Sequence, residues 1–311
     1  MTHLIKGSAL QLIGNTPIVA LDRVYTGSGR LLAKAEFMQP GGSVKDRAAK
    51  QIIENAYRCG TLRGGQMVIE MTSGNMGAGL AVVCNVIGNP FVAVMSEGNS
   101  PARVRMLESL GAKVVLVPQV DGSPGRVTGS DIERAVEKAV ILAEQNNAFY
   151  VDQFNNPNSV TAHEEGTGPE IWNALDGKVD VFVAGIGSGG TFIGTSKFLK
   201  SKKTDIICAA VEPAGAEVLA GKTVAKPRHL LQGMGYGYMP PKWEANLADS
   251  FIAVSDEEAS FFKRELAEKE GLHVGFSAAA NVCASIKFLD SQQAKAGSTI
   301  ITVLCDTGLK Y

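Results

Sequence analysis

The middle of the chain alternates short, nearly continuous apolar runs with longer amphipathic stretches. The apolar runs are rich in Val, Ile and Met, and each is followed by apolar positions at helical spacing. The pattern predicts strands at 67–71, 91–95, 113–117, 179–184 and 206–211, and helices at 76–86, 100–110, 131–146 and 168–175. Apolar runs separated by helices are typical of parallel strands that are buried on both faces. The predicted fold class is therefore α/β, doubly wound.

The same pattern divides the chain in two. A strand, a glycine-rich turn and a helix follow one another at 67–86 and again at 179–200, which predicts two sheets. Between them, the turn-rich segment 152–158 predicts a boundary. Further on, Ser255 and Glu258 form the signature of a capping box and predict a helix that runs to Lys269.

Composition narrows the classes of function. Thirty basic and thirty-one acidic residues leave a net charge of −1, without the basic excess that nucleic acid or an anionic membrane attracts. The N-terminal residues 1–6 show no signal peptide, and the apolar span 79–95 is too short and polar to cross a bilayer, so we expect a cytoplasmic protein. Five scattered cysteines and four histidines give no metal-ligand spacing, and no GxSxG motif is present.

Glycine is in excess, with 35 residues or about 11% of the chain against a usual level of roughly 7%. The segment Gly185–Thr191 follows a predicted strand and opens a predicted helix, where bare backbone amides bind anions such as phosphate. Gly185, Gly187 and Gly190 also satisfy GxGxxG, and Glu212 ends the next strand, where an acid that binds the ribose of a dinucleotide is expected. A nicotinamide cofactor, another phosphate-bearing cofactor and a tight turn with no ligand all remain open on this loop alone.

Two further segments carry polar groups at helix starts. Thr72–Gly77 suits a small carboxylate, although Ser, Thr and Asn are also ordinary helix caps. Ser43 is predicted to cap a helix that runs to Arg58 and has Lys45 in its first turn. The helix dipole there opposes a cation and favours the neutral amine that a nucleophile or base needs, whereas the alternative is a solvated lysine.

Taken together and in order, these motifs resemble the cysteine synthase (O-acetylserine sulfhydrylase) and cystathionine β-synthase family of fold-type II pyridoxal-phosphate enzymes. The resemblance covers nearly the whole chain and is carried by the segments 14–17, 43–47, 72–77, 153–157, 167–172, 185–191, 232–235, 275–277 and 306–308. It implies two doubly wound α/β domains of the tryptophan synthase β-like fold, with pyridoxal 5'-phosphate in the cleft between them. The smaller domain, 36–152, would carry the carboxylate loop. The larger one, 1–35 plus 153–311, would carry the phosphate loop.

The resemblance also implies roles for single residues. Lys45 would hold the cofactor as a Schiff base and move protons, Asn75 would contact its ring hydroxyl, and Ser277 would bind its pyridine nitrogen. The phosphate would lie on Gly187, Ser188, Gly189, Gly190 and Thr191. The α-carboxylate of the substrate would be held by Thr72, Ser73, the backbone of Met76, and Gln153, with Gly235 and Tyr236 on the substrate side.

The implied reaction is a β-replacement on an activated serine, O-acetylserine or O-phosphoserine. It would pass through an aminoacrylate and give cysteine or a related β-substituted alanine. Alternatives are a β-eliminating lyase, of the cysteine desulfhydrase or serine dehydratase type, and a non-catalytic partner of serine acetyltransferase. The family resemblance further implies a homodimer and binding of the serine acetyltransferase tail. Met76 stands where the family usually has threonine and is expected to add bulk to the carboxylate loop, and Tyr236 stands where a small residue is usual.

Overall fold

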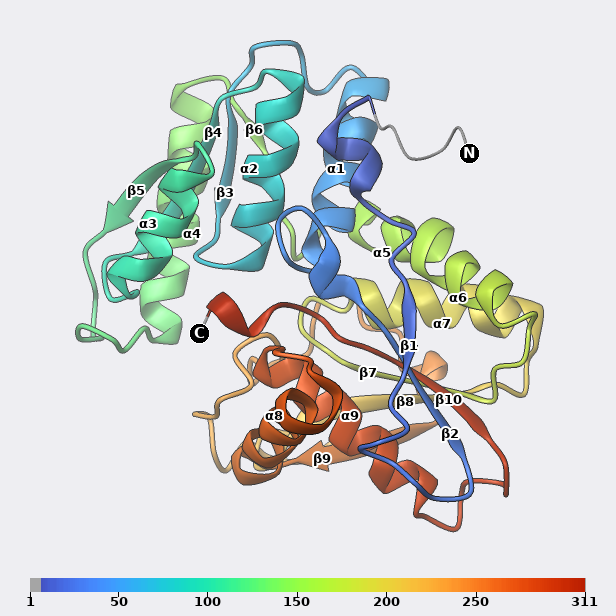
Figure 1. Cartoon of the computed structure of the whole chain (residues 1–311). Helices are drawn as coiled ribbons and strands as arrows, with labels where there is room; N and C mark the ends of the chain where they lie inside the picture. Colours follow the sequence, from blue (N-terminus) through green and yellow to red (C-terminus); the bar gives the residue numbers. More distant parts are fainter. Residues whose placement is uncertain (1–6, 311) are drawn as a thin grey trace. The chain divides into compact units, whose positions relative to one another are not determined.

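Two separate β-sheets form within residues 7–310, as the two strand–turn–helix repeats predict. The computed structural model describes residues 7–310, so the N-terminal residues considered for a signal peptide lie outside the described part. Among the described residues, unit 1 contains residues 7–13 and Gln39–Ser159, and unit 2 contains Gly14–Met38 and residues 160–310. The element labels of Figure 1 are used from here on.

Unit 1 is built on a fully parallel sheet of four strands. Their order is β5 (Lys113–Val117), β4 (Phe91–Ser96), β3 (Val68–Met71) and β6 (Phe149–Tyr150). The other elements are η1 (Ala9–Leu12), α1 (Lys45–Arg58), α2 (Asn75–Ile87), α3 (Pro101–Ser109) and α4 (Gly129–Gln145). The predicted strands and helices of this unit are therefore confirmed to within two residues at each end.

The alternation of side chains along the strands of unit 1 fills two cores. Val68 and Ala93 face a cluster that includes residues of α1, α2 and α3. Their neighbours Ile69, Val92 and Val94 face the opposite side, where alanines of α4 cover them. Because both faces are covered, the strands read as continuous apolar runs in the sequence.

Unit 2 is built on a six-stranded sheet, in which only β1 and β2 pair antiparallel. The strand order is β1 (Ile18–Ala20), β2 (Arg30–Lys34), β10 (Thr299–Val303), β7 (Val181–Gly185), β8 (Ile207–Pro213) and β9 (Ser250–Val254). Its helices are α6 (Gly168–Ala174), α7 (Gly190–Lys202), α8 (Asp256–Glu270) and α9 (Phe276–Leu289), with short turns η2 (Glu36–Met38), η4 (Ala245–Leu247) and η5 (Gly308–Lys310). The chain passes from unit 1 into unit 2 within α5 (Asn158–Ala162), which continues into a π-helical turn, η3 (His163–Thr167).

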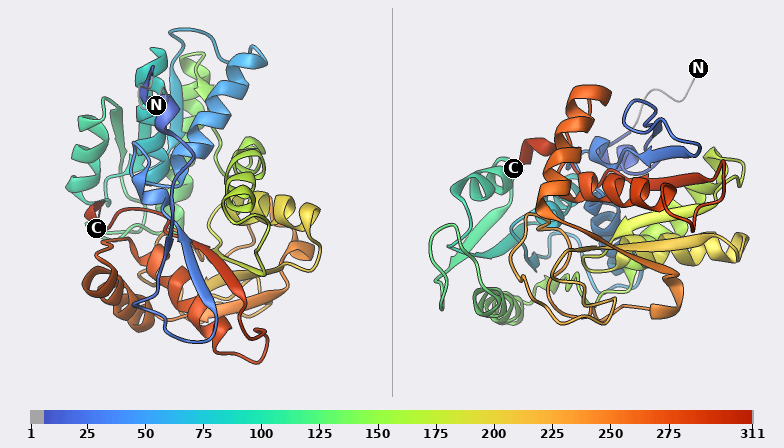
Figure 2. Two further views of the ribbon diagram at one scale, coloured as in Figure 1. Left: turned by 45° about the vertical axis from the view of Figure 1, so that its right-hand side comes forward. Right: turned by 90° about the horizontal axis from the view of Figure 1, so that it is seen from below.

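Helices cover both faces of this second sheet as well. Val181 and Val183 of β7 pack against α9 within one buried cluster that also includes residues of α8. Phe182, between them, points the other way and stacks on Phe192 of α7 with ring centroids 6.0 Å apart. The views in Figure 2 show the orange-to-red α8 and α9 together on one side of this sheet. The capping box predicted at Ser255 is confirmed, since its hydroxyl accepts the N–H of Glu258 at 3.2 Å.

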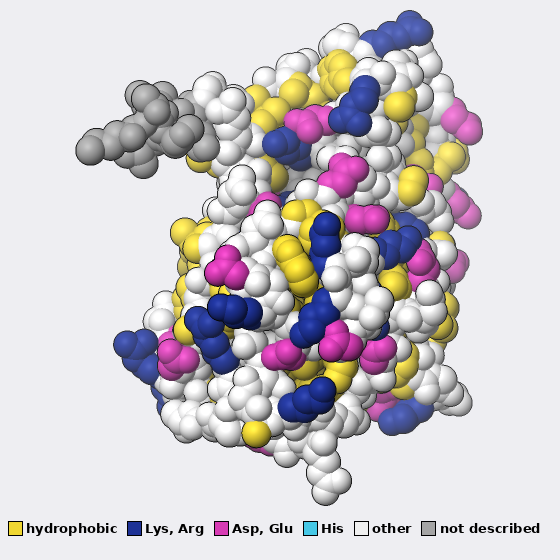
Figure 3. All heavy atoms as spheres, turned by 90° about the vertical axis from the view of Figure 1, so that its right-hand side faces the viewer, with side chains coloured by type: hydrophobic (Ala, Val, Ile, Leu, Met, Phe, Trp, Pro, Cys, Tyr) yellow, Lys and Arg dark blue, Asp and Glu magenta, His cyan; other side chains and the backbone are white. Residues whose placement is uncertain are grey.

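The surface is mixed in charge. On the face drawn in Figure 3, acidic and basic side chains are interspersed rather than gathered by sign. Within residues 7–310, none of the helices combines the length and the apolar character that crossing a bilayer requires.

Candidate functional site

The loop between β7 and α7 in unit 2 exposes backbone amides at a helix start. Gly189 caps α7 with φ of +88°, and no side chain caps this helix end. At Gly187 a Cβ atom would lie 2.3 Å from the carbonyl oxygen of Gly233, so only glycine fits. Free N–H groups at the positive end of a 13-residue helix form a site for an anion such as phosphate.

A buried asparagine fixes the start of this loop. Asn281 of α9 is fully buried, and its Oδ1 accepts the N–H of Gly185 at 2.8 Å. Its Nδ2 donates to the carbonyl oxygen of Val303 in β10 at 2.8 Å. The side chain therefore links the loop to the neighbouring strand. The sequence signal for it is a single amide within the otherwise small and apolar helix α9.

Three segments of unit 2 that are distant in sequence meet at this loop. Ser277 is the second residue of α9 and is 9% exposed. A Cβ at Gly233 would lie 2.9 Å from the Ser277 hydroxyl, and the N–H of Gly235 donates to the carbonyl of Ile186 at 3.2 Å. The structure thus brings together the predicted residues of the 187–191 loop, the 233–237 loop and the start of α9.

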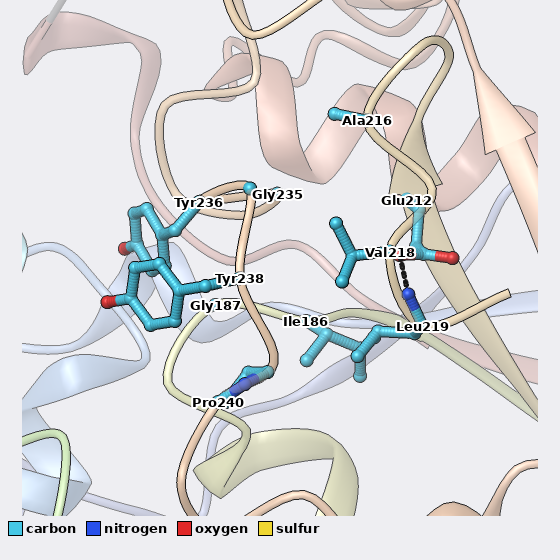
Figure 4. Close-up of a pocket in the computed structure, with 11 residues that line it drawn as sticks. Ile186, Gly187, Glu212, Ala216, Val218, Leu219, Gly235, Tyr236, Tyr238 and Pro240 are labelled. Carbon is cyan, nitrogen blue, oxygen red and sulfur yellow. Dashed lines mark hydrogen bonds between the residues drawn. The ribbon is translucent and has the colours of Figure 1, made fainter. Parts of the chain in front are cut away.

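Tyr236 lies over the same loop, beside a small pocket (Figure 4). Its ring stacks on that of Tyr238, with centroids 6.1 Å apart, and its hydroxyl oxygen would lie 3.6 Å from a Cβ at Gly187. Tyr236 is 41% exposed, and the desolvation of its phenol on this loop, together with the neighbouring Tyr238, raises its pKa to about 12. At neutral pH the phenol is therefore protonated and acts as a hydrogen-bond donor rather than a base.

Glu212 lines the same pocket. The GxGxxG spacing suggests that this acid binds the ribose of a dinucleotide, but in the structure it has a different role. Its carboxylate accepts the N–H of Leu219 at 2.7 Å, the dashed line in Figure 4, and that of Ala220 at 3.0 Å. Burial raises the pKa of this carboxyl group. Both carboxylate oxygens therefore accept hydrogen bonds from the 216–220 loop. Glu212 is thus already engaged by backbone groups of its own unit.

In unit 1, the loop Thr72–Gly77 joins β3 to α2 and folds around one hydroxyl. Thr72 Oγ1 accepts the N–H of Gly77 at 3.0 Å, and the Ser73 hydroxyl accepts from Arg103 of α3 at 3.0 Å. Asn75 is the first residue of α2. Met76 departs from the expectation, because its side chain is 3% exposed and packs in the core of unit 1. The methionine side chain therefore adds volume to the core of unit 1 and not to the carboxylate loop.

Lys45 begins α1, one residue later than the pattern predicts, and Ser43 Oγ accepts its N–H at 3.3 Å. The starts of α1 and α2 lie against each other, since a Cβ at Gly79 would be 3.1 Å from the Cα of Asp46. Lys45 and the Thr72–Gly77 loop are consequently at the same end of this helix pair. The predicted residues of unit 1 therefore also group together.

Gln153 is the remaining predicted site residue; it lies in unit 1, although the expected boundary assigns it to the larger domain, and it is held by a buried acid. Its Nε2 donates to Glu70 Oε1 at 3.2 Å and to the carbonyl of Met71 at 3.3 Å. Glu70 is 1% exposed, and burial, together with the charge of Asp152, raises its pKa to about 8. At neutral pH the carboxyl group is mostly neutral. Sequence reasoning missed Glu70, whose only signal is one acid inside the apolar strand β3.

Comparison with known proteins extends over the whole chain. A family model described as pyridoxal-phosphate dependent enzyme matches residues 9–306. Cysteine synthase A of Escherichia coli K12 is 38% identical over 319 residues, which covers 100% of this chain and 95% of the relative.

Two solved structures are similar throughout. One is O-acetyl serine sulfhydrylase isoform 3 of Entamoeba histolytica, with 33% identity, a TM-score of 0.91 and coverage of 100% of this chain and 91% of the other. The second is a hydrogen sulfide-producing enzyme of Fusobacterium nucleatum, with 35% identity, a TM-score of 0.91 and coverage of 99% and 98%.

Proposed function

The chain belongs to the family of pyridoxal-phosphate dependent enzymes, and we propose that it is an enzyme of the cysteine synthase type. It would replace the β-substituent of an activated serine, O-acetylserine or O-phosphoserine, and form cysteine when the nucleophile is sulfide. The observation that carries this proposal is the full-length similarity to cysteine synthase A. The name of the Entamoeba structure favours O-acetylserine among the two donors.

The residues of unit 2 fit the phosphate and the ring of the cofactor. The uncapped N-terminus of α7 offers backbone amides to a phosphate, and the glycine at 187 leaves no Cβ in its way. Gly187, Ser188, Gly189, Gly190 and Thr191 would hold the phosphate. Ser277, next to Gly233, would face the pyridine nitrogen with a neutral hydroxyl. Lys45 would bind the cofactor covalently through its amine, and Asn75 would contact the ring hydroxyl.

When bound, pyridoxal phosphate supplies the electron sink that permits loss of a proton from Cα and of a leaving group from Cβ. The amine of Lys45, at the start of α1, would take the Cα proton and later return it. The substrate's α-carboxylate would lie at the positive end of α2, on Thr72, Ser73 and the Met76 backbone. Glu70 holds the amide of Gln153, which would complete this carboxylate site.

The substrate side of the proposed site differs from the usual family pattern at Tyr236. Its protonated phenol would donate a hydrogen bond toward the leaving group or the incoming nucleophile. The Gly235 backbone, held by the Ile186 carbonyl, would set the position of this tyrosine. This arrangement favours a small nucleophile.

Product analysis tests the reaction. The purified protein is incubated with O-acetylserine or O-phosphoserine, with and without sulfide, and cysteine and pyruvate are measured. We expect cysteine to form only with sulfide and pyruvate to be minor. If pyruvate forms at one rate whatever acceptor is present, the β-replacement proposal is wrong.

The lysine is tested separately by colour. Purified Lys45→Ala is expected to lose the visible absorbance of the lysine-bound cofactor and the activity, while its far-ultraviolet circular dichroism stays unchanged. Lys50→Ala is the matched control on the same helix, since Lys50 instead donates to the Leu10 carbonyl at 3.1 Å. A visible band that persists in Lys45→Ala would show that another lysine holds the cofactor.

A β-eliminating lyase is the second candidate, and the similarity to a hydrogen sulfide-producing enzyme favours it. This activity would release sulfide, pyruvate and ammonia from cysteine. Incubation with cysteine alone, followed by sulfide detection, distinguishes the two reactions.

A further inference from the structure

A buried histidine stands behind the predicted phosphate loop of unit 2. His163 opens the π-helical turn η3 and is 1% exposed. Its Nδ1 lies 2.8 Å from the hydroxyl oxygen of Thr167, and its Nε2 lies 3.2 Å from that of Thr191. One imidazole thus bridges two hydroxyl groups, and one of these is in the first turn of α7.

The local backbone is shaped to allow this contact. A Cβ at Gly194 would lie 2.2 Å from the carbonyl oxygen of Val160 and 2.9 Å from the Cβ of His163. Glycine at 194 therefore lets α7 lie directly against η3. Thr191, three residues earlier, is on the same side of α7 and within reach of the ring. Single π-helical turns are rare and concentrate at functional sites.

The position of the proton on the imidazole decides whether Thr191 presents its O–H group or its oxygen lone pairs to an anion. If Nδ1 carries the only proton, Nε2 accepts the Thr191 O–H, and the lone pairs of that oxygen face the loop. If Nε2 carries the proton, it donates to Thr191 Oγ1, and the threonine O–H turns to the anion. Thr167 then donates its O–H to Nδ1. A phosphate dianion stabilises the second arrangement, because it accepts a hydrogen bond instead of facing a lone pair.

We propose that His163 is a positioning residue for the cofactor phosphate, which donates Nε2–H to Thr191 and thereby orients the Thr191 hydroxyl as a donor to the phosphate. This inference rests on the proposed function, since it assumes that pyridoxal phosphate binds at the 187–191 loop. His163 itself does not touch the phosphate. Its effect is therefore confined to ligands that carry one.

The first experiment observes the proton directly. Nitrogen-15 NMR of the histidine-labelled holoenzyme assigns His163 among the four histidines of the chain by comparison with His163→Gln. We expect a protonated Nε2 in the loaded protein. A loaded protein in which Nε2 is unprotonated and only Nδ1 carries the proton would overturn the proposal.

The second experiment measures affinity of the apoenzyme for pyridoxal phosphate and for pyridoxal, which lacks the phosphate. His163→Phe keeps a flat ring but has no donor, and it is expected to weaken pyridoxal phosphate binding about tenfold. Binding of pyridoxal should stay unchanged. Equal losses for both ligands would show a merely structural role. His163→Gln places an amide donor near the original Nε2 and should restore most of the affinity, which keeps the test valid if the phenylalanine variant folds poorly.

A double-mutant cycle then links the two residues. Thr191→Val removes the donor, so adding His163→Phe to it should cause no further loss of pyridoxal phosphate affinity. Additive losses would contradict the proposal. If the wild-type protein binds no pyridoxal phosphate at all, the proposed function fails, which is a different outcome from wild-type binding that His163→Phe leaves unchanged.

Discussion

Replacing Glu70 by glutamine is expected to stabilise the protein, and increasingly so as the pH rises. The pKa of this carboxyl group is raised from 4.5 to about 8 in the folded protein because β3 buries it. Between these two values the unfolded chain releases a proton that the folded chain retains, so the folded state loses stability as the pH increases. Glutamine resembles the neutral acid and can accept the same hydrogen bond from Gln153.

The size of the effect follows from the shift. At about 1.4 kcal/mol per pKa unit, a rise from 4.5 to about 8 corresponds to about 5 kcal/mol. Wild type should therefore be less stable than Glu70→Gln by about 2 kcal/mol at pH 6 and by about 4 kcal/mol at pH 8, with the full difference reached only at higher pH, whereas the two should be nearly equal at pH 4.5.

Urea unfolding at pH 5, 6, 7 and 8, followed by circular dichroism, measures these differences. Trp172 and Trp243 are the only tryptophans and both lie in unit 2, so their fluorescence reports on the unit without Glu70. Glu108→Gln, at an exposed position on α3, is the control and should keep the wild-type dependence on pH. A difference between Glu70→Gln and wild type that stays constant from pH 5 to 8 would refute a neutral Glu70.

Four further substitutions, at three positions, test the site in unit 2. Asn281→Leu leaves the N–H of Gly185 without its partner and should lower the free energy of unfolding by about 2 kcal/mol in urea, with weaker pyridoxal phosphate binding. Gly187→Ala places a Cβ 2.3 Å from the carbonyl of Gly233, so the purified protein should lack visible absorbance while keeping its circular dichroism. Tyr236→Phe should leave the shape of the pH–rate profile from pH 6 to 9 unchanged, because the pKa of the phenol is about 12; a lost limb would contradict this. Tyr236→Ala should raise kcat/KM for a bulky thiol relative to sulfide by about tenfold.

The sequence pattern is most informative where a segment is buried by its own neighbours. The run at 91–95 became β4 with almost the same limits, because helices cover both faces of this strand, and the run at 113–117 became β5, the partly exposed strand at the edge of the sheet. The capping box at Ser255 is similarly local and correct. Such features depend on residues within a few positions of each other.

Pairing between strands that are distant in the sequence produces no such local pattern. The pattern does not single out β2 or β10, although the two strands pair in parallel within the unit 2 sheet, from Thr299 opposite Arg30 to Val303 opposite Lys34. Strand β2 ends in Lys34, a charged residue that suggests a surface position. In the structure Lys34 is 1% exposed and its Nζ pairs with Glu170 at 2.8 Å. Only the folded chain supplies this partner.

The difference between local and long-range features also decides which parts of the candidate site could be predicted from the sequence. The glycine-rich loops at 72–77 and 185–191 follow strands and precede helices, so sequence reasoning located them. Gln153, His163 and Asn281 depend on partners that come from other segments, and of these only Gln153 was predicted, through family resemblance. The side chain of Met76 is expected from the sequence to add bulk to the carboxylate loop, whereas it belongs to the core because α2 buries that face.

These buried polar groups share one physical task. A loop built from glycine binds anions through its backbone, and it has few side chains with which to hold its own shape. Asn281 fixes the backbone of the loop in unit 2, and His163 contacts the hydroxyl at Thr191. In unit 1, Glu70 plays the corresponding part for Gln153. Each of these three supporting side chains is uncharged or can become uncharged. It therefore does not repel the anion that the loop would bind. Substitutions in this supporting layer should therefore change ligand affinity without any loss of a direct ligand contact, and charge-introducing ones should weaken it most.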